Sequence, residues 1–118
     1  MKRENQAILS FNEIKSSFEY LEALYIKRYC SDSNCEDIMT IVLSEDFNNS
    51  ISHKKLVIKF TGIQKIKLNS MGSVAALNIN IFDLTDSQME DVKYKIDEDE
   101  ENIFSFYCKS FSFSIKDE

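Results

Sequence analysis

The last third of the chain carries three consecutive segments in which apolar and polar residues alternate with a period of two. In an extended strand, alternate side chains point to the same face, and aromatic and β-branched residues suit a half-buried sheet. Residues 92–116 therefore predict antiparallel strands, each with one apolar face. The apolar members are Val92, Tyr94 and Ile96, then Phe104, Phe106 and Cys108, and finally Phe111, Phe113 and Ile115.

Two interruptions of this pattern predict how the strands connect. The acidic run at residues 97–101 is not expected to be buried, so it predicts an exposed hairpin connection. Between Cys108 and Phe111 the apolar set changes parity. Because Lys109-Ser110 offers neither glycine nor Asn-Gly, a bulge or bend in one long strand is favoured over a tight hairpin.

Earlier segments add strands of the same kind. Alternating or continuous apolar runs occupy residues 37–44, 54–60 and 74–82, and polar turn signals separate them. Residues 63–68 fit either a continuing strand or a single turn. The connections are too short for parallel crossovers. The expected fold class is α+β and mainly β, an antiparallel sheet of six or seven strands with one short N-terminal helix, in a single domain over residues 1–118.

Residues 5–29 combine two patterns. From Ile8 to Tyr25, apolar residues recur every three or four positions, which is the stripe of an amphipathic helix. The end of this region, LYIKRYC, is instead rich in strand-forming residues. We predict a short helix within residues 3–15 and a strand within residues 20–30, while one continuous helix stays open as the alternative.

The inward-facing positions of these elements make up the expected core. The four phenylalanines near the C-terminus could instead line a small-ligand pocket, but core packing explains the same stripe and is favoured. The core candidates are Leu56, Ile58, Phe60, Leu77, Ile79, Ile81, Tyr94, Phe104, Phe106, Phe111 and Phe113.

The net charge of −6 is unevenly distributed. Residues 47–82 hold five lysines and no acid, whereas residues 85–101 hold eight acids and two lysines. This segregation could make a dipolar surface, unless the fold brings the oppositely charged segments together, but two solvated faces are the favoured interpretation. The excess of acids argues against nucleic acid as a partner, because phosphate binding draws on clustered lysine and arginine. It is compatible with a basic protein partner.

Targeting signals and cysteines suggest the compartment. No apolar run approaches the roughly 18 residues of a membrane span, so no membrane partner is expected. The N-terminus places charges on both sides of a short apolar group, whereas a signal peptide needs an unbroken apolar region. We therefore expect a cytoplasmic protein in which Cys30, Cys35 and Cys108 are reduced thiols. Cys108 lies in an aromatic face and is expected to be a core residue, not a nucleophile.

Candidate chemistry is sparse. Cys30, Cys35 and His53 could be drawn together as a zinc site, but no fourth ligand completes it, so neither a metal nor another cofactor is expected. Glu90 and Asp91 could act as acid and base, yet adjacent residues on a strand point to opposite faces. With one histidine and no glycine-rich phosphate loop, the chain is expected to be a binding module and not an enzyme.

The order of signals in the second half resembles a known group of bacterial proteins. The segments LVIKFTGIQKIKL, LNINIFDLTDSQMEDVKYKI and FSFYCKSFSFSI follow one another there. This order is similar to that of small immunity proteins from bacterial polymorphic toxin systems, over about residues 54–115. The resemblance implies an α+β or mainly β fold and a non-enzymatic role, which is binding a cognate toxin inside the producing cell.

The acids between residues 86 and 101 are the candidate partner-binding residues. Clustered acids can steer a basic partner, such as a basic toxin domain, into encounter. Tyr94 or Tyr107, if outward, would supply the desolvated anchors that acids alone do not. The alternative function is a small-ligand-binding or structural domain with an aromatic-lined pocket, and the oligomeric state stays open. The eight acids are Asp86, Glu90, Asp91, Asp97, Glu98, Asp99, Glu100 and Glu101.

Overall fold

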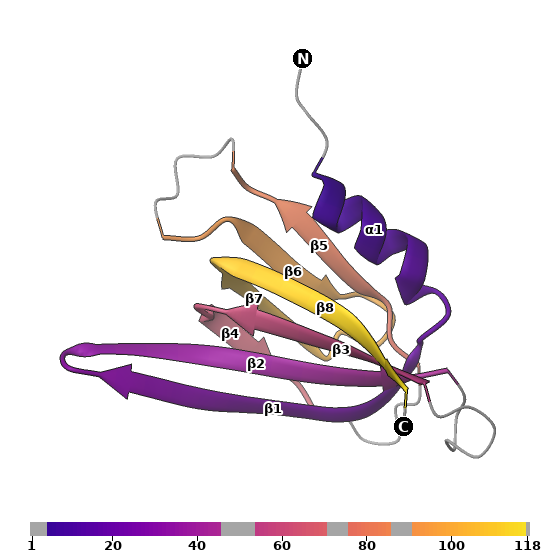
Figure 1. Ribbon diagram of the computed structural model, residues 1–118, viewed down its shortest axis with the longest axis horizontal. Coiled ribbons are helices and arrows are strands. Elements are labelled where there is room, and N and C mark those ends of the chain that lie inside the picture. Colours follow the sequence, from indigo (N-terminus) through magenta and orange to yellow (C-terminus); the bar gives the residue numbers. More distant parts are fainter. Residues whose placement is uncertain (1–4, 46–53, 71–75, 86–90, 118) are drawn as a thin grey trace.

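A computed structural model describes residues 5–45, 54–70, 76–85 and 91–117 (Figure 1). Within these ranges the chain forms one helix and eight strands, and all strand pairs are antiparallel. The mainly β fold with a short N-terminal helix is confirmed. The elements are α1 (Gln6–Lys15), β1 (Tyr20–Ser31), β2 (Asn34–Ser44), β3 (Lys54–Thr61), β4 (Gln64–Leu68), β5 (Ile79–Asp83), β6 (Tyr94–Glu98), β7 (Phe104–Cys108) and β8 (Ser110–Asp117).

The strands form two sheets of four, in the orders β1-β2-β3-β8 and β4-β7-β6-β5. The expectation of one sheet with six or seven strands is therefore wrong. The reason is a bend that two neighbouring strands share: β3 pairs with β8 in the first sheet, and their continuations β4 and β7 pair in the second. Strands that bend from one sheet into another make the corners of such two-layer folds. The structure confirms the helix and the strand that were predicted within residues 5–29. It also shows that residues 63–68 form a strand and not a single turn.

Gly62 and Lys109 lie at this corner. Gly62 has a φ of 73°, in the left-handed region that glycine adopts at no steric cost. The N–H of Lys109 donates to the carbonyl oxygen of Thr61 at 2.9 Å. The N–H groups of Gly62 and Ile63 both donate to the carbonyl oxygen of Asp37, at 3.0 and 3.2 Å. The bend predicted near Lys109 is confirmed, although its two halves belong to different sheets.

One buried cluster fills the space between the sheets. Eight of the eleven core candidates are buried, and the other three, Tyr94, Phe111 and Phe113, are partly buried and pack against the cluster. Phe104 and Phe106 lie within it, so core packing is the correct interpretation of the aromatic stripe. The buried hydrophobic residues are Phe11, Phe18, Met39, Ile41, Leu43, Leu56, Ile58, Phe60, Leu77, Ile79, Ile81, Val92, Ile96, Ile103, Phe104, Phe106 and Cys108.

Helix α1 lies beside β5 and closes one side of the core (Figure 1). Phe11 is fully buried, and its ring makes edge-on contacts with Phe111 and Phe113 at centroid distances of 6.4 and 5.6 Å. At the other end of the helix, the Lys15 ammonium donates to the carbonyl oxygen of Ile79 at 2.8 Å. The helix is thus fixed to strands of both sheets.

The β1–β2 hairpin extends beyond the other strands of its sheet (Figure 1). β3 pairs with β2 only from Ile38 to Ser44, so residues 28–37 form a two-stranded arm. The turn of the arm is the dipeptide Asp32-Ser33, in which Asp32 has a φ of 52°. Both edges of this arm therefore lack a third strand within the described part of the chain.

Cys30 and Cys35 form a disulfide across the arm, with their Cα atoms 4.0 Å apart. The expectation that all three cysteines are reduced is wrong for this pair. The hairpin register places the two residues directly opposite each other, one position before the last pair of the arm. Cys108 is a free thiol and is buried, as predicted for a core residue.

Candidate partner-binding site

The connection between β6 and β7 is organised by one buried carboxylate. Glu98 is 1% exposed, and its carboxylate accepts backbone N–H groups from Asn78 at 3.1 Å, Glu100 at 2.8 Å, Glu101 at 3.0 Å and Ile103 at 3.1 Å. The expectation that the whole acidic run is exposed is wrong for Glu98. Its charge is compensated by N–H donors, which is the condition under which a carboxylate can be buried. Glu98 thus shapes the connection and does not present its carboxylate to solvent.

The other acids of this connection face outward. Asp97 is half-buried and Asp99, Glu100 and Glu101 are exposed, and we call these four residues the acidic tip. The side chains of Glu100 and Glu101 make no hydrogen bond or ion pair with the described residues, whereas their backbone N–H groups are held by Glu98. The tip therefore has a fixed backbone, and its Glu100 and Glu101 carboxylates have no partner among the described residues.

Two asparagines of β5 fix the remaining carboxylates of the tip. The Asn78 amide donates to Asp99 at 2.7 Å, and the Asn80 amide donates to Asp99 at 2.9 Å and to Asp97 at 3.2 Å. These hydrogen bonds, first from Asn78 and then from Asn80, lower the pKa of Asp99. Lys15 lies nearby: burial lowers the pKa of its ammonium, while the charges of Asp99 and Asp97 act in the opposite direction.

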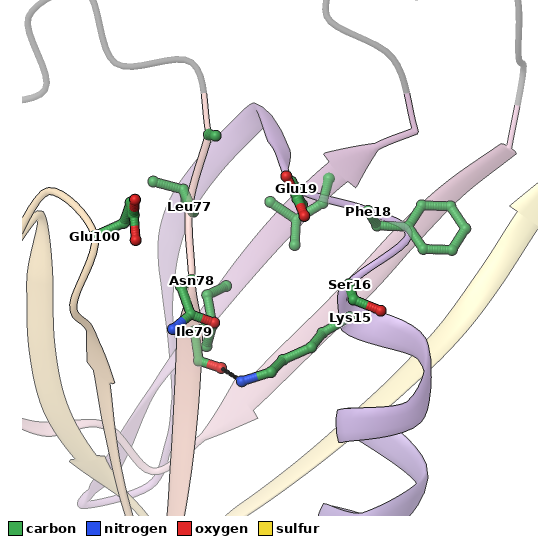
Figure 2. Close-up of a pocket in the computed structure, with 10 residues that line it drawn as sticks. Lys15, Ser16, Phe18, Glu19, Leu77, Asn78, Ile79 and Glu100 are labelled. Atoms are coloured by element: carbon green, nitrogen blue, oxygen red, sulfur yellow. Dashed lines mark hydrogen bonds between the residues drawn. The ribbon is translucent and has the colours of Figure 1, made fainter.

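A hollow with a volume of about 260 Å³ adjoins the tip, between the end of α1, the start of β1 and the segment before β5. Figure 2 shows Lys15 reaching across to Ile79, to which its ammonium is hydrogen-bonded. Glu19 and Glu100 both line the hollow, and Leu77 lies in the same wall. The fold therefore brings Glu19, an acid from far away in the sequence, next to the acidic tip. No sequence signal indicated this position, because it depends on how β1 meets β5.

The structure does not gather all eight predicted acids. Asp91 is exposed, but it lies before β6, at the end of the strand opposite to the acidic tip. Asp86 and Glu90 lie outside the described residues. Of the six described acids, four form one surface, the acidic tip, while Glu98 is buried and Asp91 lies apart from the tip.

Lysines of the second sheet partly offset these acids. Lys67 on β4 and Asp97 on β6 both pair with Ser105 of β7, one from each side. Lys95 of β6 lies two positions from Asp97 on the same face. The fold therefore brings part of the lysine-rich segment close to the acidic one, since Lys67 lies across one strand from Asp97, and this proximity weakens the dipolar alternative.

The two tyrosines considered as anchors lie on opposite faces of the sheet. Tyr94 points inward: its ring packs edge-on against Phe111 at 5.0 Å, and its hydroxyl accepts a hydrogen bond from Asn5 at 3.0 Å. Tyr107 lies on the outer face, where the Lys65 ammonium sits 5.8 Å from its ring centroid. Of the two, only Tyr107 is placed to contact a partner.

The largest exposed aromatic groups lie on β1, away from the tip. Tyr25 is 54% exposed, Tyr29 is 50% exposed, and Ile26 between them is 41% exposed. The sequence analysis did not single them out. Tyr25, Lys27 and Tyr29 are spaced with a period of two, which places all three on one face of β1, and this spacing was the signal in the sequence.

Reactive groups are few in the described ranges. Burial raises the pKa of the Cys108 thiol to about 12, so it is a poor nucleophile at neutral pH. No group of three or more His, Cys, Asp or Glu side chains among these residues could hold a metal ion. Cys30 and Cys35 are joined to each other, and His53 of the zinc hypothesis lies outside the described residues.

Comparison with known proteins identifies a family. In the described ranges, no helix has the length and apolar character needed to cross a membrane. No curated protein and no solved structure matches the chain. The sequence model of one family, immunity protein PIM8, matches residues 3–114. This match extends the resemblance seen over residues 54–115 to α1 and the β1–β2 hairpin. The chain therefore belongs to the PIM8 immunity protein family.

Proposed function

We propose that this protein neutralises a protein toxin by stoichiometric, non-enzymatic binding in the cytoplasm of the producing cell. Membership in an immunity protein family supports the class of partner. The acidic tip supports a basic surface on that partner, since Asp97, Asp99, Glu100 and Glu101 lie together on one hairpin. The single observation that carries the proposal is the buried Glu98 carboxylate, which fixes the backbone beneath these acids.

A fixed acidic tip acts mainly on the rate of association. Exposed ion pairs contribute only about 0–1 kcal/mol each, so single contacts at the tip add little affinity. Several like charges in one place instead attract an oppositely charged surface over about a Debye length, which raises the association rate at low salt. Because Glu98 and the two asparagines already order the tip, little further ordering is needed when a partner binds.

The hollow beside the tip fits the same kind of partner. Its wall combines the apolar Leu77 with the carboxylates of Glu19 and Glu100. A lysine or arginine side chain could place its aliphatic part against Leu77 and its charge between the two acids. Such a contact would supply the desolvated anchor that Tyr94 cannot, because Tyr94 points into the core.

The alternative, an aromatic-lined pocket for a small ligand, has less support. Phe104 and Phe106 are buried in the core, while Phe111 and Phe113 pack against Phe11. These rings are occupied by contacts with one another and do not form one aromatic-lined site.

The test uses the product of the neighbouring gene, since an immunity protein is normally encoded beside its toxin. Co-expression with that product should restore growth of cells that it inhibits, and the purified pair should bind with 1:1 stoichiometry in calorimetry. Failure of both assays with a folded immunity protein would contradict toxin neutralisation.

A second experiment locates the binding surface. The double variant Glu100→Lys and Glu101→Lys should slow association with the toxin about tenfold or more at low salt and flatten its salt dependence. These side chains make no internal contacts with the described residues, so the melting temperature should stay nearly unchanged. The matched control is Glu13→Lys with Asp117→Lys, which changes the net charge equally at exposed positions elsewhere. Equal slowing by both variants would show a general charge effect and not a site at the tip.

A further inference from the structure

The disulfide between Cys30 and Cys35 lies at the surface, near the end of the two-stranded arm that projects beyond the other strands (Figure 1). Both cysteines are exposed, whereas the third, Cys108, is a free thiol buried in the core. Exposed disulfides exchange more readily with thiols, because the attacking thiolate must reach one of the two sulfur atoms. The arm therefore presents its disulfide to thiols in solution.

The contacts at the base of the arm are independent of this disulfide. The Arg28 guanidinium makes two hydrogen bonds to the Asp37 carboxylate, at 2.7 and 3.2 Å. The Asp37 carbonyl oxygen in turn accepts the N–H groups of Gly62 and Ile63 at the corner of the sheets. The two cysteines are five positions apart, so their bond closes a short loop and constrains little of the unfolded chain. Opening the disulfide should therefore change the end of the arm and leave the core folded.

A hollow with a volume of about 340 Å³ lies between the arm and the corner of the two sheets. Its walls come from the base of the arm and from residues of the corner, among them Gly62 and Lys109. Cys35 lines this hollow, and Cys30 is not one of its lining residues. The fold therefore treats the two cysteines differently, because a small molecule in the hollow lies beside Cys35.

Four charged residues line the same hollow. Arg28 and Asp37 form an ion pair with each other, so their charges are already compensated. Lys109 and Glu36 form no ion pair with the described residues, which leaves one cation and one acid for a ligand. A zwitterionic molecule, with an ammonium and a carboxylate, is complementary to these two charges. Thiols derived from amino acids, such as cysteine and glutathione, carry both groups.

We propose that the arm disulfide is a reversible exchange site for amino-acid-derived thiols, at which Cys35 takes the adduct. The thiolate of the small molecule attacks the Cys35 sulfur, and the bond between the two protein sulfurs breaks. Cys30 leaves with the electron pair as a thiolate and then takes up a proton. A second small thiolate attacks the sulfur of the bound small molecule and releases Cys35, which is protonated in turn. The net reaction oxidises two small thiols to their disulfide and reduces the protein disulfide to two thiols.

Such exchange is compatible with a disulfide in a protein proposed to act in the cytoplasm. Thiols are kept reduced in that compartment, and the disulfides found there are usually transient or redox-sensing. The exchange site nevertheless does not depend on toxin binding, because the acidic tip belongs to the second sheet and the arm to the first. A failure of thiol exchange would leave the proposed function untouched, and a failure of toxin binding would leave the exchange site untouched.

Reduction of the folded protein is the first test. After incubation with excess reduced glutathione, a thiol reagent should label Cys30 and Cys35, as read by mass spectrometry of peptides. Cys108 is the internal control, because it is buried and should stay unlabelled while the protein is folded. The melting temperature should fall by only a few degrees. No labelling without denaturant, or labelling of all three cysteines together, would overturn the proposal.

Single variants test which cysteine takes the adduct. Cys30→Ser and Cys35→Ser each leave one thiol on the arm, and each variant is treated with oxidised glutathione. The thiol of Cys35, present in Cys30→Ser, should form the glutathione adduct several times faster than the thiol of Cys30. Circular dichroism confirms that both variants are folded. Equal rates, or a faster reaction of Cys30, would contradict the assignment of the adduct to Cys35.

A charge reversal tests the role of the hollow. In the Cys30→Ser background, Lys109→Glu should slow the reaction with oxidised glutathione and leave the reaction with the uncharged disulfide of 2-mercaptoethanol nearly unchanged. The matched control is Lys116→Glu, which makes the same charge change at an exposed position near the other end of β8. Equal slowing by the two variants, or equal effects on both reagents, would contradict recognition of a zwitterion in the hollow.

Discussion

Gly62 and Lys109 are packed so closely that a Cβ atom on Gly62 would lie 2.8 Å from both Cγ and Cδ of Lys109. These two residues occupy the positions where neighbouring strands pass from one sheet to the other. Glycine is thus required at position 62 for two reasons. The φ of 73° is unfavourable for other residues, and a side chain would collide with Lys109. The packing of the Lys109 side chain against Gly62, together with the hydrogen bond from the Lys109 N–H to the Thr61 carbonyl oxygen, ties the two strands together at the corner.

The first prediction concerns this corner. Gly62→Ala should lower the free energy of unfolding by more than about 1–2 kcal/mol, since the left-handed conformation alone costs about that much for a residue with a Cβ and the close contact with Lys109 adds to it. Urea denaturation measures the change. In a Lys109→Gly background the same substitution should cost less, because only the conformational penalty remains. An equal cost in both backgrounds would show that the contact with Lys109 adds nothing.

The second prediction concerns the carboxylate beneath the acidic tip. Glu98→Gln should lower the free energy of unfolding by about 1–3 kcal/mol, because an amide replaces one acceptor oxygen with a donor that faces backbone N–H groups. The exposed Glu100→Gln should change stability by less than about 0.5 kcal/mol and serves as the control. Hydrogen exchange at the amide groups of Glu100 and Ile103 should accelerate in Glu98→Gln. Unchanged exchange would mean that Glu98 does not order the tip.

The third prediction is a pH dependence at Asp99. Hydrogen bonds from Asn78 and Asn80 depress its pKa in the folded protein. A depressed pKa stabilises the fold above the unfolded value of about 4, and this contribution is lost as the pH falls through the folded pKa. Wild type should therefore be more stable than Asp99→Asn at pH 7, and the difference should shrink below pH 4. Thermal unfolding between pH 2.5 and 7 measures it, and a difference that does not vary with pH would contradict the assignment.

The fourth prediction concerns the three cysteines. The native protein should not react with a thiol reagent at neutral pH, because Cys30 and Cys35 are joined and the buried Cys108 thiol has a pKa of about 12. Unfolding in denaturant without reductant should expose one reactive thiol per chain. Unfolding with reductant should expose three reactive thiols per chain. The variant Cys108→Ala should show none before reduction. Rapid labelling of the native wild type would argue against either the disulfide or the burial.

The sequence by itself determined the local elements of this protein. Apolar patterns identified β2, β3, β5 and β6, and predicted β7 and β8 as one bent strand, while residues 63–68 (β4) fitted either a strand or a turn. The change from a helical to a strand-forming pattern separated α1 from β1. It also predicted most of the core, because a strand with one apolar face must bury that face. The family resemblance, drawn from the second half of the chain, was confirmed over nearly its whole length. The positions of strands, helix and core residues depend on residues that are close together in the sequence, so they can be predicted without knowledge of the fold.

Only the tertiary structure decided which residues lie opposite each other. The division into two sheets follows from the meeting of Gly62 and Lys109, 47 positions apart in the chain. Glu98 resembles its acidic neighbours in sequence, yet it is buried because backbone N–H groups from its own connection and from Asn78, a distant residue, converge on it. Cys30 and Cys35 pair because of the hairpin register. Strand alternation specifies a face but not a partner, so contacts between distant segments become visible only when the chain is folded.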